Sequence, residues 1–271
     1  MSEQAHRARK RFGQHFLEPA WVEKVVRAIA PEPDQTFLEI GPGRGELTRP
    51  LLHRARHVVA FEIDRDLTRA LQATAPPNLT LIEGDFLDAT PERLRSLFAG
   101  AGTIRVAGNL PYNVASPILF KLAELSDADL TVSDATLMLQ REVADRLTAT
   151  PGTRDYGLLA VLIGRRAAVE PVLMLPPGAF RPPPKVRSAL VRLRFHPASP
   201  PVKDEGLFSV LVRSIFMHRR KTLKNALGAS AATQKLARAD LLALAQLDSR
   251  RRPETLTPEE LARLAELLAA D

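Results

Sequence analysis

The chain has 271 residues, of which 45% are hydrophobic and 25% charged, and this ordinary globular composition excludes a disordered, collagen-like or coiled-coil protein. Its 38 Lys and Arg outnumber 31 Asp and Glu, and the net charge of +7 favours a polyanionic partner such as nucleic acid. The absence of cysteine excludes disulfides, thiolate metal sites, iron–sulfur clusters and cysteine nucleophiles.

The first two thirds of the chain alternate between segments typical of helices and of strands. Helices are predicted at residues 21–30, 46–54, 67–73, 91–99 and 117–125, and strands at 36–40, 57–63, 79–83, 103–107 and 135–139. Such a βαβ series predicts an α/β fold, in which helices cover both faces of a Rossmann-like parallel sheet. Two later segments, 158–165 and 188–195, are predicted as strands that complete the far edge of the sheet.

A proline-rich linker is predicted at residues 196–206, where the periodic pattern lapses. Beyond it, apolar residues recur at helical spacing in segments 207–216, 234–245 and 258–270. Thr257 followed by Glu260 is typical of a capping box at the start of the last helix. We therefore expect two domains, an α/β domain at residues 1–198 and a small all-helical domain at residues 199–271.

No membrane span or secretory signal is predicted. The longest apolar run, residues 158–163, is far shorter than the roughly 20 residues that a span needs. The basic N-terminal residues lead into no apolar region of the kind that a signal peptide contains. We therefore expect a cytoplasmic protein.

Three groups of basic residues contain few or no acids and account for the excess positive charge. One such run is usually only a solvated face, but three together favour contact with nucleic acid. The groups are Arg7, Arg9, Lys10 and Arg11; Arg181, Lys185, Arg187, Arg192 and Arg194; and Arg213, Arg219, Arg220, Lys221 and Lys224.

A glycine-rich loop, Gly41-Pro42-Gly43-Arg44-Gly45, separates a predicted strand from a predicted helix, where α/β sheets bind nucleotide-type ligands. The dinucleotide fingerprint would need a small residue at the position of Glu46, so a nicotinamide dinucleotide is disfavoured. A carboxylate beside the helix start would also repel a pyrophosphate. The alternative interpretation is a glycine turn that binds nothing.

Two carboxylates follow at the ends of successive predicted strands. Glu62 ends the second strand, from which a carboxylate can accept hydrogen bonds from both ribose hydroxyls. Asp85 follows the third strand and could accept from an adenine amine. Each residue alone could be a helix cap or a turn residue. Their recurrence favours an adenosine ligand without a phosphate cradle, which S-adenosylmethionine fits.

After the fourth strand, the motif Asn109-Leu110-Pro111-Tyr112 resembles that of the ribosomal RNA adenine dimethyltransferase family. The resemblance extends to the segment 12–17, the Gly41 loop, Glu62, Asp85 and the proline-rich segment 180–188. The long proline motif and the basic helical tail resemble the housekeeping small-subunit branch of the family more than the macrolide-resistance methylases.

The resemblance implies a class I methyltransferase domain at residues 1–198, with S-adenosylmethionine as cofactor, and an RNA-binding domain at residues 199–271. It implies N6,N6-dimethylation of two adjacent adenosines in the terminal hairpin loop of small-subunit (16S) ribosomal RNA during ribosome biogenesis. The expected partner is this RNA or the immature 30S subunit, and a monomer is the default. By resemblance, Gln14 and Leu17 close over the methionine end of the cofactor. His15, where bacterial members of the family commonly have asparagine, is expected to bind the cofactor through its backbone. The alternative is an N-terminal arm that merely packs.

The chemistry of the motif agrees with this resemblance. The lone pair of adenine N6 is delocalised into the ring, so the amine is a poor nucleophile. Acceptors at the Asn109 side chain and at a backbone carbonyl near Leu110 can localise that lone pair and aim it. Pro111 fixes the turn, Tyr112 offers a face for the extruded base, and Phe180 could form the opposite wall. Tyr112 could instead be a turn aromatic and Phe180 an ordinary core residue.

Other site types have little support in the sequence. His53 and His57 are four residues apart, but no third ligand is evident, so we predict no metal site. Two rival functions remain open: a DNA adenine methyltransferase that adds one methyl group, and a ribosome-assembly or transcription factor that has lost turnover. The intact acceptor motif argues against the second rival.

Overall fold

The computed structural model describes residues 14–126, 132–237 and 239–269, so the basic group at residues 7–11 lies outside the described residues. The chain divides into two compact units. The first comprises Met1–Ala144 and Ala167–His196, and the second comprises Asp145–Arg166 and Pro197–Asp271. This division differs from the predicted boundary in one segment, because residues 145–166 group with the C-terminal part of the chain.

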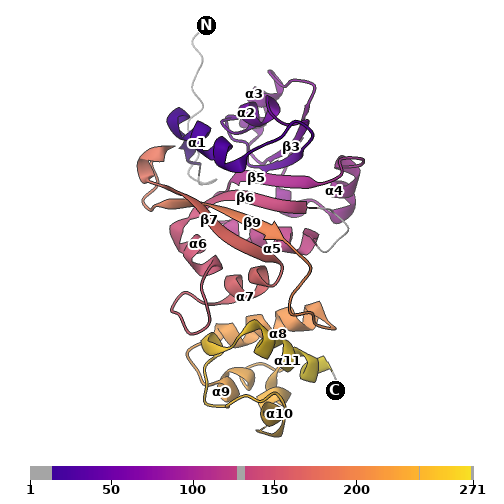
Figure 1. Ribbon diagram of the computed structural model, residues 1–271, viewed down its shortest axis with the longest axis vertical. Helices are drawn as coiled ribbons and strands as arrows, with labels where there is room; N and C mark the ends of the chain where they lie inside the picture. The colour runs from indigo at the N-terminus through magenta and orange to yellow at the C-terminus, as the bar shows by residue number, and fades with distance from the viewer. Residues whose placement is uncertain (1–13, 127–131, 238, 270–271) are drawn as a thin grey trace. The chain divides into compact units, whose positions relative to one another are not determined.

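A seven-stranded mixed sheet forms the centre of the first unit (Figure 1). The strand order is β4-β3-β2-β5-β6-β9-β7, in which neighbours from β4 to β6 are parallel and β9 is antiparallel to both β6 and β7. A separate two-stranded sheet pairs β1 (Phe16–Leu17) with β8 (Phe180–Arg181). The large sheet contains β2 (Thr36–Ile40), β3 (His57–Glu62), β4 (Leu79–Glu83), β5 (Ile104–Asn109), β6 (Val132–Gln140), β7 (Ala167–Leu175) and β9 (Ser188–Phe195).

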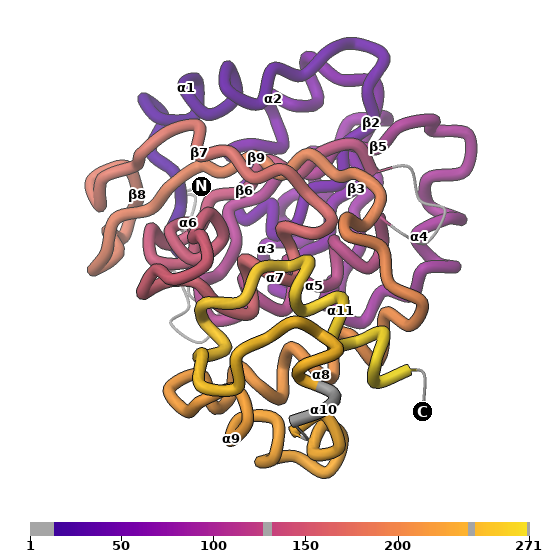
Figure 2. The backbone as a smooth tube through the Cα atoms, turned by 60° about the horizontal axis from the view of Figure 1, so that its bottom comes forward, coloured from indigo at the N-terminus to yellow at the C-terminus, as the bar shows by residue number. Residues whose placement is uncertain are grey.

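Helices cover both faces of this sheet, with α1 and α2 on one side and α5 on the other (Figures 1 and 2). Side-chain caps start several of them: Asp64 accepts from the Asp66 amide before α3, and Thr90 accepts from the Arg93 amide before α4. The helices that lie wholly or partly in the first unit are α1 (Pro19–Ile29), α2 (Thr48–Leu52), α3 (Arg65–Gln72), η2 (Phe86–Asp88), α4 (Pro91–Leu97), α5 (Ala115–Ser126), α6 (Arg141–Leu147) and η3 (Pro177–Ala179).

The predicted strand at residues 158–165 is wrong, because the segment is the helix α7 (Leu158–Gly164). A short apolar run does not distinguish a buried strand from a buried helix. Here Leu159 to Ile163 are all buried, so the helix has no polar face that would have revealed its period. The strand that completes the sheet is instead β7 (Ala167–Leu175), which the sequence analysis missed.

The second unit is helical and contains α7 together with the C-terminal helices (Figure 2). The Arg165 side chain is fully buried here and donates to the Pro200 carbonyl and to both carboxylate oxygens of Glu205. The predicted capping box is confirmed by reciprocal bonds between Thr257 and Glu260. The C-terminal helices are α8 (Glu205–Met217), α9 (Leu223–Leu227), η4 (Gln234–Ala237), α10 (Ala239–Leu244), η5 (Pro253–Thr255) and α11 (Pro258–Ala269).

None of the helices in the described ranges has both the length and the apolar character that a membrane span requires.

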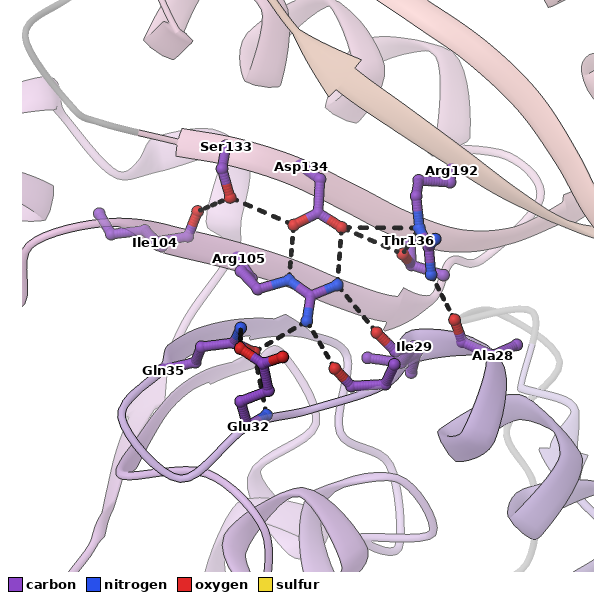
Figure 3. Close-up of polar contacts among 11 residues, drawn as sticks. Ala28, Ile29, Glu32, Gln35, Ile104, Arg105, Ser133, Asp134, Thr136 and Arg192 are labelled. Carbon is purple, nitrogen blue, oxygen red and sulfur yellow. Dashed lines mark hydrogen bonds and ion pairs between the residues drawn. The ribbon is translucent and has the colours of Figure 1, made fainter.

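A buried polar network ties the end of α1 to the sheet (Figure 3). The Arg105 guanidinium, on β5, makes five hydrogen bonds, which reach the Ile29 and Ala30 carbonyls, the Gln35 side chain and both oxygens of Asp134. Arg192 donates to the Ala28 carbonyl and lies 3.7 Å from the Asp134 carboxylate. These contacts satisfy the last carbonyls of α1, which have no partner within the helix.

Candidate active site

A cavity of about 330 Å³ opens where the parallel strands β2, β3, β4 and β5 end. Ligands of open α/β sheets bind at this edge. All the predicted cofactor residues line the cavity, together with the four residues of the Asn109 motif. They are Gln14, His15, Leu17, Gly41, Gly43, Glu62, Asp85, Asn109, Leu110, Pro111 and Tyr112.

The glycine loop and Glu62 form one wall. Gly41 and Gly43 have φ of 70° and 62°, a left-handed conformation that residues with a Cβ rarely adopt. Glu62 fixes this loop, because its Oε2 accepts from the Gly43 amide at 3.0 Å while its Oε1 accepts from the Asp64 amide at 2.9 Å. Each carboxylate oxygen has a second acceptor site, so both can still accept from a ribose hydroxyl.

Three carboxylates line this part of the cavity: Glu39, Glu46 and Glu62. Burial raises the pKa of all three. For Glu39, burial outweighs the lowering effect of the nearby Thr48 hydroxyl and, with the charges of Glu46 and Glu62, raises the pKa to about 8. Glu39 is 1% exposed, and its Oε2 has no hydrogen-bond partner among the described residues. A buried acceptor of this kind fits a cationic donor group, such as the ammonium of a methionine moiety.

Asp85 is a cap, as one of its two predicted interpretations had it, and it also lies where the other interpretation places a ligand acceptor. Its Oδ1 accepts from the Leu87 amide at 2.9 Å and caps η2, and the residue also lines the cavity. Ile63 and Phe86, each directly after a predicted carboxylate, line the same cavity. Apolar residues beside acceptors suit a flat ring with a polar edge, such as adenine.

The segment from Gln14 to Leu17 closes another side of the cavity. Gln14 Nε2 donates to Asp64 Oδ2 at 3.1 Å, and β1 pairs with β8 so that Leu17 faces Phe180. Gly43 permits this close approach, since a Cβ there would lie 3.3 Å from the Phe16 ring.

Asn109 lies at the end of β5, and its side-chain nitrogen donates to the His15 carbonyl at 2.6 Å. Because the nitrogen is the donor in this bond, the amide oxygen Oδ1 is left to accept from another group. Pro111 O accepts from the Val114 amide at 3.1 Å, which leaves the Leu110 carbonyl as the better candidate for a second acceptor.

Tyr112 presents a ring at the cavity and is held at its hydroxyl, which lies 2.8 Å from Ser188 Oγ. Burial raises the pKa of the Tyr112 phenol, although the bond to Ser188 lowers it, so the phenol stays protonated at neutral pH. Tyr112 therefore offers an aromatic face and not a base.

Phe180 lies elsewhere. Its side chain is 3% exposed and belongs to the hydrophobic core with Leu17, Val26 and Leu190, and it is not among the residues that line the cavity. The register of β1 with β8 explains this, because it places Phe180 opposite Leu17. The structure therefore gives Phe180 the core role that was the alternative to a pocket wall.

Sequence reasoning missed several lining residues, among them Glu39, Glu46, Ile63 and Phe86. A signal was available, since Glu39, Ile63 and Phe86 lie within three residues of a strand end that already carried a predicted ligand. Glu46 directly follows the predicted glycine loop. His57, considered for a metal pair, instead bonds Thr80 Oγ1 at 2.9 Å. In the ranges that the structure describes, no cluster of three His, Cys, Asp or Glu could hold a metal.

The basic groups differ in how far acids elsewhere in the chain neutralise them. Arg181 pairs with Glu18, Arg194 with Glu170, and Arg192 belongs to the buried network of α1. The exposed residues that make no ion pair within the described ranges are Lys185, Arg187, Arg220, Lys221 and Lys224.

Comparisons with known proteins show the family to which the chain belongs. The model of the ribosomal RNA adenine dimethylase family matches residues 5–269. The chain belongs to this family. It is 42% identical to the ribosomal RNA small subunit methyltransferase A of Idiomarina loihiensis over 97% of this chain and 88% of the relative. It is 44% identical to the protein of that name from Aromatoleum aromaticum, over 98% and 96%.

Two solved structures resemble more than nine tenths of the chain. A dimethyladenosine transferase from Plasmodium falciparum has a TM-score of 0.74 at 26% identity and covers 92% of this chain and 96% of its own. The 23S rRNA methyltransferase ErmE has a TM-score of 0.62 at 27% identity, with 94% and 99% covered. The predicted family and fold class are therefore confirmed, and the protein is an S-adenosylmethionine-dependent ribosomal RNA adenine dimethyltransferase.

Proposed function

We propose that this dimethyltransferase adds two methyl groups to N6 of each of two adjacent adenosines in the terminal hairpin loop of small-subunit ribosomal RNA. Two relatives that match nearly the whole chain are named small subunit methyltransferase A, which supports this substrate. A loop suits the chemistry, because its bases can be splayed out and stacked on protein, whereas a duplex resists extrusion. We infer that the immature 30S subunit is the working partner and that the protein acts as a cytoplasmic monomer.

The hydrogen bond from the Asn109 side chain to the His15 carbonyl is the observation that best supports this assignment of the site. It orients the Asn109 amide so that Oδ1 can accept one N6–H of the target base, while the Leu110 carbonyl accepts the other. Two acceptors localise the N6 lone pair and hold it in line with the methyl group. Once methylated, the nitrogen is acidic and loses its proton to solvent, so a neutral amide suffices in this position.

The remaining lining residues would bind and orient the two ligands. When bound, S-adenosylmethionine supplies an electrophilic methyl group on a sulfonium. Glu62 would accept from the ribose hydroxyls, Asp85 from the adenine amine, and Glu39 from the ammonium. Gln14, His15 and Leu17 would cover the methionine end, His15 through its backbone, beside the loop of Gly41 and Gly43. Tyr112 would stack the target base, an interaction worth about 1–3 kcal/mol.

The direct test is mass spectrometry of nucleosides from small-subunit RNA incubated with the protein and isotopically labelled S-adenosylmethionine. The expected product is N6,N6-dimethyladenosine at two adjacent positions. A single N6-methyl mark made only on DNA would favour the DNA methyltransferase. RNA binding without any methylated nucleoside would favour an assembly factor.

Replacing Asn109 tests the acceptor role. We expect Asn109→Ala to abolish methyl transfer, because the amine loses the acceptor that localises its lone pair, while the Kd for S-adenosylmethionine stays nearly unchanged. Gln72→Ala, at an exposed position of α3 outside the cavity, is the control and should behave as the wild type. Full transfer by Asn109→Ala would refute the role.

A further inference from the structure

The His15 ring is stacked on Tyr112. The two ring centroids lie 5.5 Å apart, the planes are inclined by 28°, and both residues line the cavity. One face of the ring proposed to bind the target base is thus already covered by a side chain from the N-terminal arm.

Both rings are held at a second point. His15 Nδ1 lies 2.7 Å from the Pro182 carbonyl, and since a carbonyl oxygen can only accept, Nδ1 must carry the proton. The Tyr112 hydroxyl lies 2.8 Å from Ser188 Oγ. Ser188 is buried and begins β9, so it is a firm anchor. The stacked pair is therefore fixed from both sides.

The spacing leaves no room for a base between the two rings. A planar base needs about 3.5 Å to the ring on each side, or about 7 Å between the enclosing rings. The observed separation of 5.5 Å is too small. Without a rearrangement, a base can stack only on the face of Tyr112 that His15 does not cover.

We propose that the His15 imidazole is a positioning residue for methyl transfer, which holds the Tyr112 ring from one face so that the opposite face receives the target adenine. The inference rests on the proposed function, in which Tyr112 stacks that base. His15 then serves both groups that recognise the adenine: its carbonyl orients the Asn109 amide, and its ring orients Tyr112. Side-chain substitution removes only the second contact, so the two roles can be separated.

The experiment compares His15→Asn, which removes the ring, with His15→Phe, which keeps a ring but loses the bond to Pro182. His53→Asn, at an exposed position, is the matched control. For each variant, kcat and KM are measured with a small-subunit RNA hairpin, and the Kd for S-adenosylmethionine is measured by calorimetry. We expect His15→Asn to lower kcat about three- to tenfold, the equivalent of one aromatic pair, with an unchanged Kd. His15→Phe should recover most of the kcat, and His53→Asn should match the wild type.

A double-mutant cycle shows whether His15 acts through Tyr112. In a Tyr112→Ala background, His15→Asn should cause no further loss in single-turnover rate, because no ring is left to hold. Additive losses would overturn the proposal, as would wild-type kcat in His15→Asn, a His15→Phe variant as slow as His15→Asn, or a raised Kd for the cofactor.

Different results would contradict the proposed function and the role of His15. A wild-type protein that does not methylate the hairpin, or a Tyr112→Ala variant with full activity, would contradict the proposed function. A slow Tyr112→Ala variant beside a fully active His15→Asn variant would overturn only the role of His15.

Discussion

Glu62 both lines the candidate cofactor site and holds the glycine loop that forms one wall of it. Its two oxygens accept from the Gly43 and Asp64 amides, so the side chain that would bind the ribose also fixes the glycine loop. Losing it removes both a ligand and the order of the loop. The same residue type at a strand end could have been only a cap, and the sequence could not decide between these roles.

We expect Glu62→Ala to raise the Kd for S-adenosylmethionine at least tenfold, because charge-assisted hydrogen bonds contribute about 1.5–3 kcal/mol. Isothermal calorimetry measures this. Glu83→Ala, which ends the neighbouring strand and pairs with Arg65, is the matched control and should leave the Kd within about twofold. An unchanged Kd in Glu62→Ala would argue against the ribose contact.

Glu39 makes the stability of the cofactor-free protein depend on pH. Its pKa rises from 4.5 to about 8 in the folded chain, so the folded state binds the proton more tightly than the unfolded state. The stabilisation from this group is complete below pH 4.5 and is lost as the pH rises toward 8. Glu46 and Glu62, whose pKa values are also raised, act in the same direction.

The expected result is a melting temperature that falls between pH 5 and pH 8 without cofactor, and a clearly smaller fall in Glu39→Gln. Thermal unfolding followed by circular dichroism in a pH series checks this. Glu124→Gln, at an exposed position, should show the wild-type slope. Equal slopes in the wild type and Glu39→Gln would show that this carboxylate is not protonated in the fold.

At the scale of elements, α1 links the buried network to the site. Its C-terminal carbonyls are held by Arg105 and Arg192 (Figure 3), while the strand β1 that precedes it closes the cavity. The Arg105 and Asp134 side chains are only 12% and 10% exposed, so their ion pair is poorly screened by solvent. The network therefore anchors the C-terminal end of the helix whose N-terminal end follows the segment Gln14 to Leu17.

We expect Arg105→Met to lower the free energy of unfolding by about 3 kcal/mol, because it leaves a buried carboxylate and helix carbonyls without their main donor. Trp21, the only tryptophan, lies in α1, so its fluorescence in a urea titration reports this helix directly. Adding Asp134→Leu to Arg105→Met should restore only part of the loss, since the buried carboxylate is removed but Arg192 then loses its own contact with Asp134. Wild-type stability in Arg105→Met would mean that packing alone holds α1.

Helices and strands were predicted correctly from the sequence where the residues within the segment determine its secondary structure. Residues 36–40 and 79–83 are strands as predicted, because each is a short apolar segment bounded by turn residues. It missed β7, which contains Pro171 and alternates irregularly. Proline is tolerated in β7 because it is an edge strand, and that position comes from the tertiary fold.

Contacts that depend on the tertiary fold were also not predictable at the candidate site. Carboxylates and glycines at strand ends were predictable because a parallel sheet gathers its strand ends at one edge. The stack of His15 on Tyr112, the bond from Asn109 to the His15 carbonyl and the core position of Phe180 were not. All three depend on how β1 pairs with β8, a contact between segments more than 160 residues apart that no local pattern reveals.

At the scale of the whole molecule, the chain enters the second unit twice. Residues 145–166 leave the α/β unit, contribute α7 to the helical unit, and return to form β7. The buried side chains of α7 and the fully buried Arg165, paired with Glu205, belong to the same unit as α8. The predicted boundary at residue 198 would therefore divide a compact unit.

We expect a chain that ends at residue 198 to expose the apolar side chains of α7 and to leave Arg165 without Glu205, so it should bind a hydrophobic dye and aggregate. A chain that also ends there but replaces residues 145–166 with a flexible linker of about ten residues should instead be monomeric, because it retains only the first unit. Size-exclusion chromatography and dye fluorescence compare the two, and Trp21 fluorescence checks that α1 is folded in both. If instead the chain that keeps residues 145–166 is monomeric and binds less dye than the chain with the linker, the folding of α7 does not depend on the C-terminal helices.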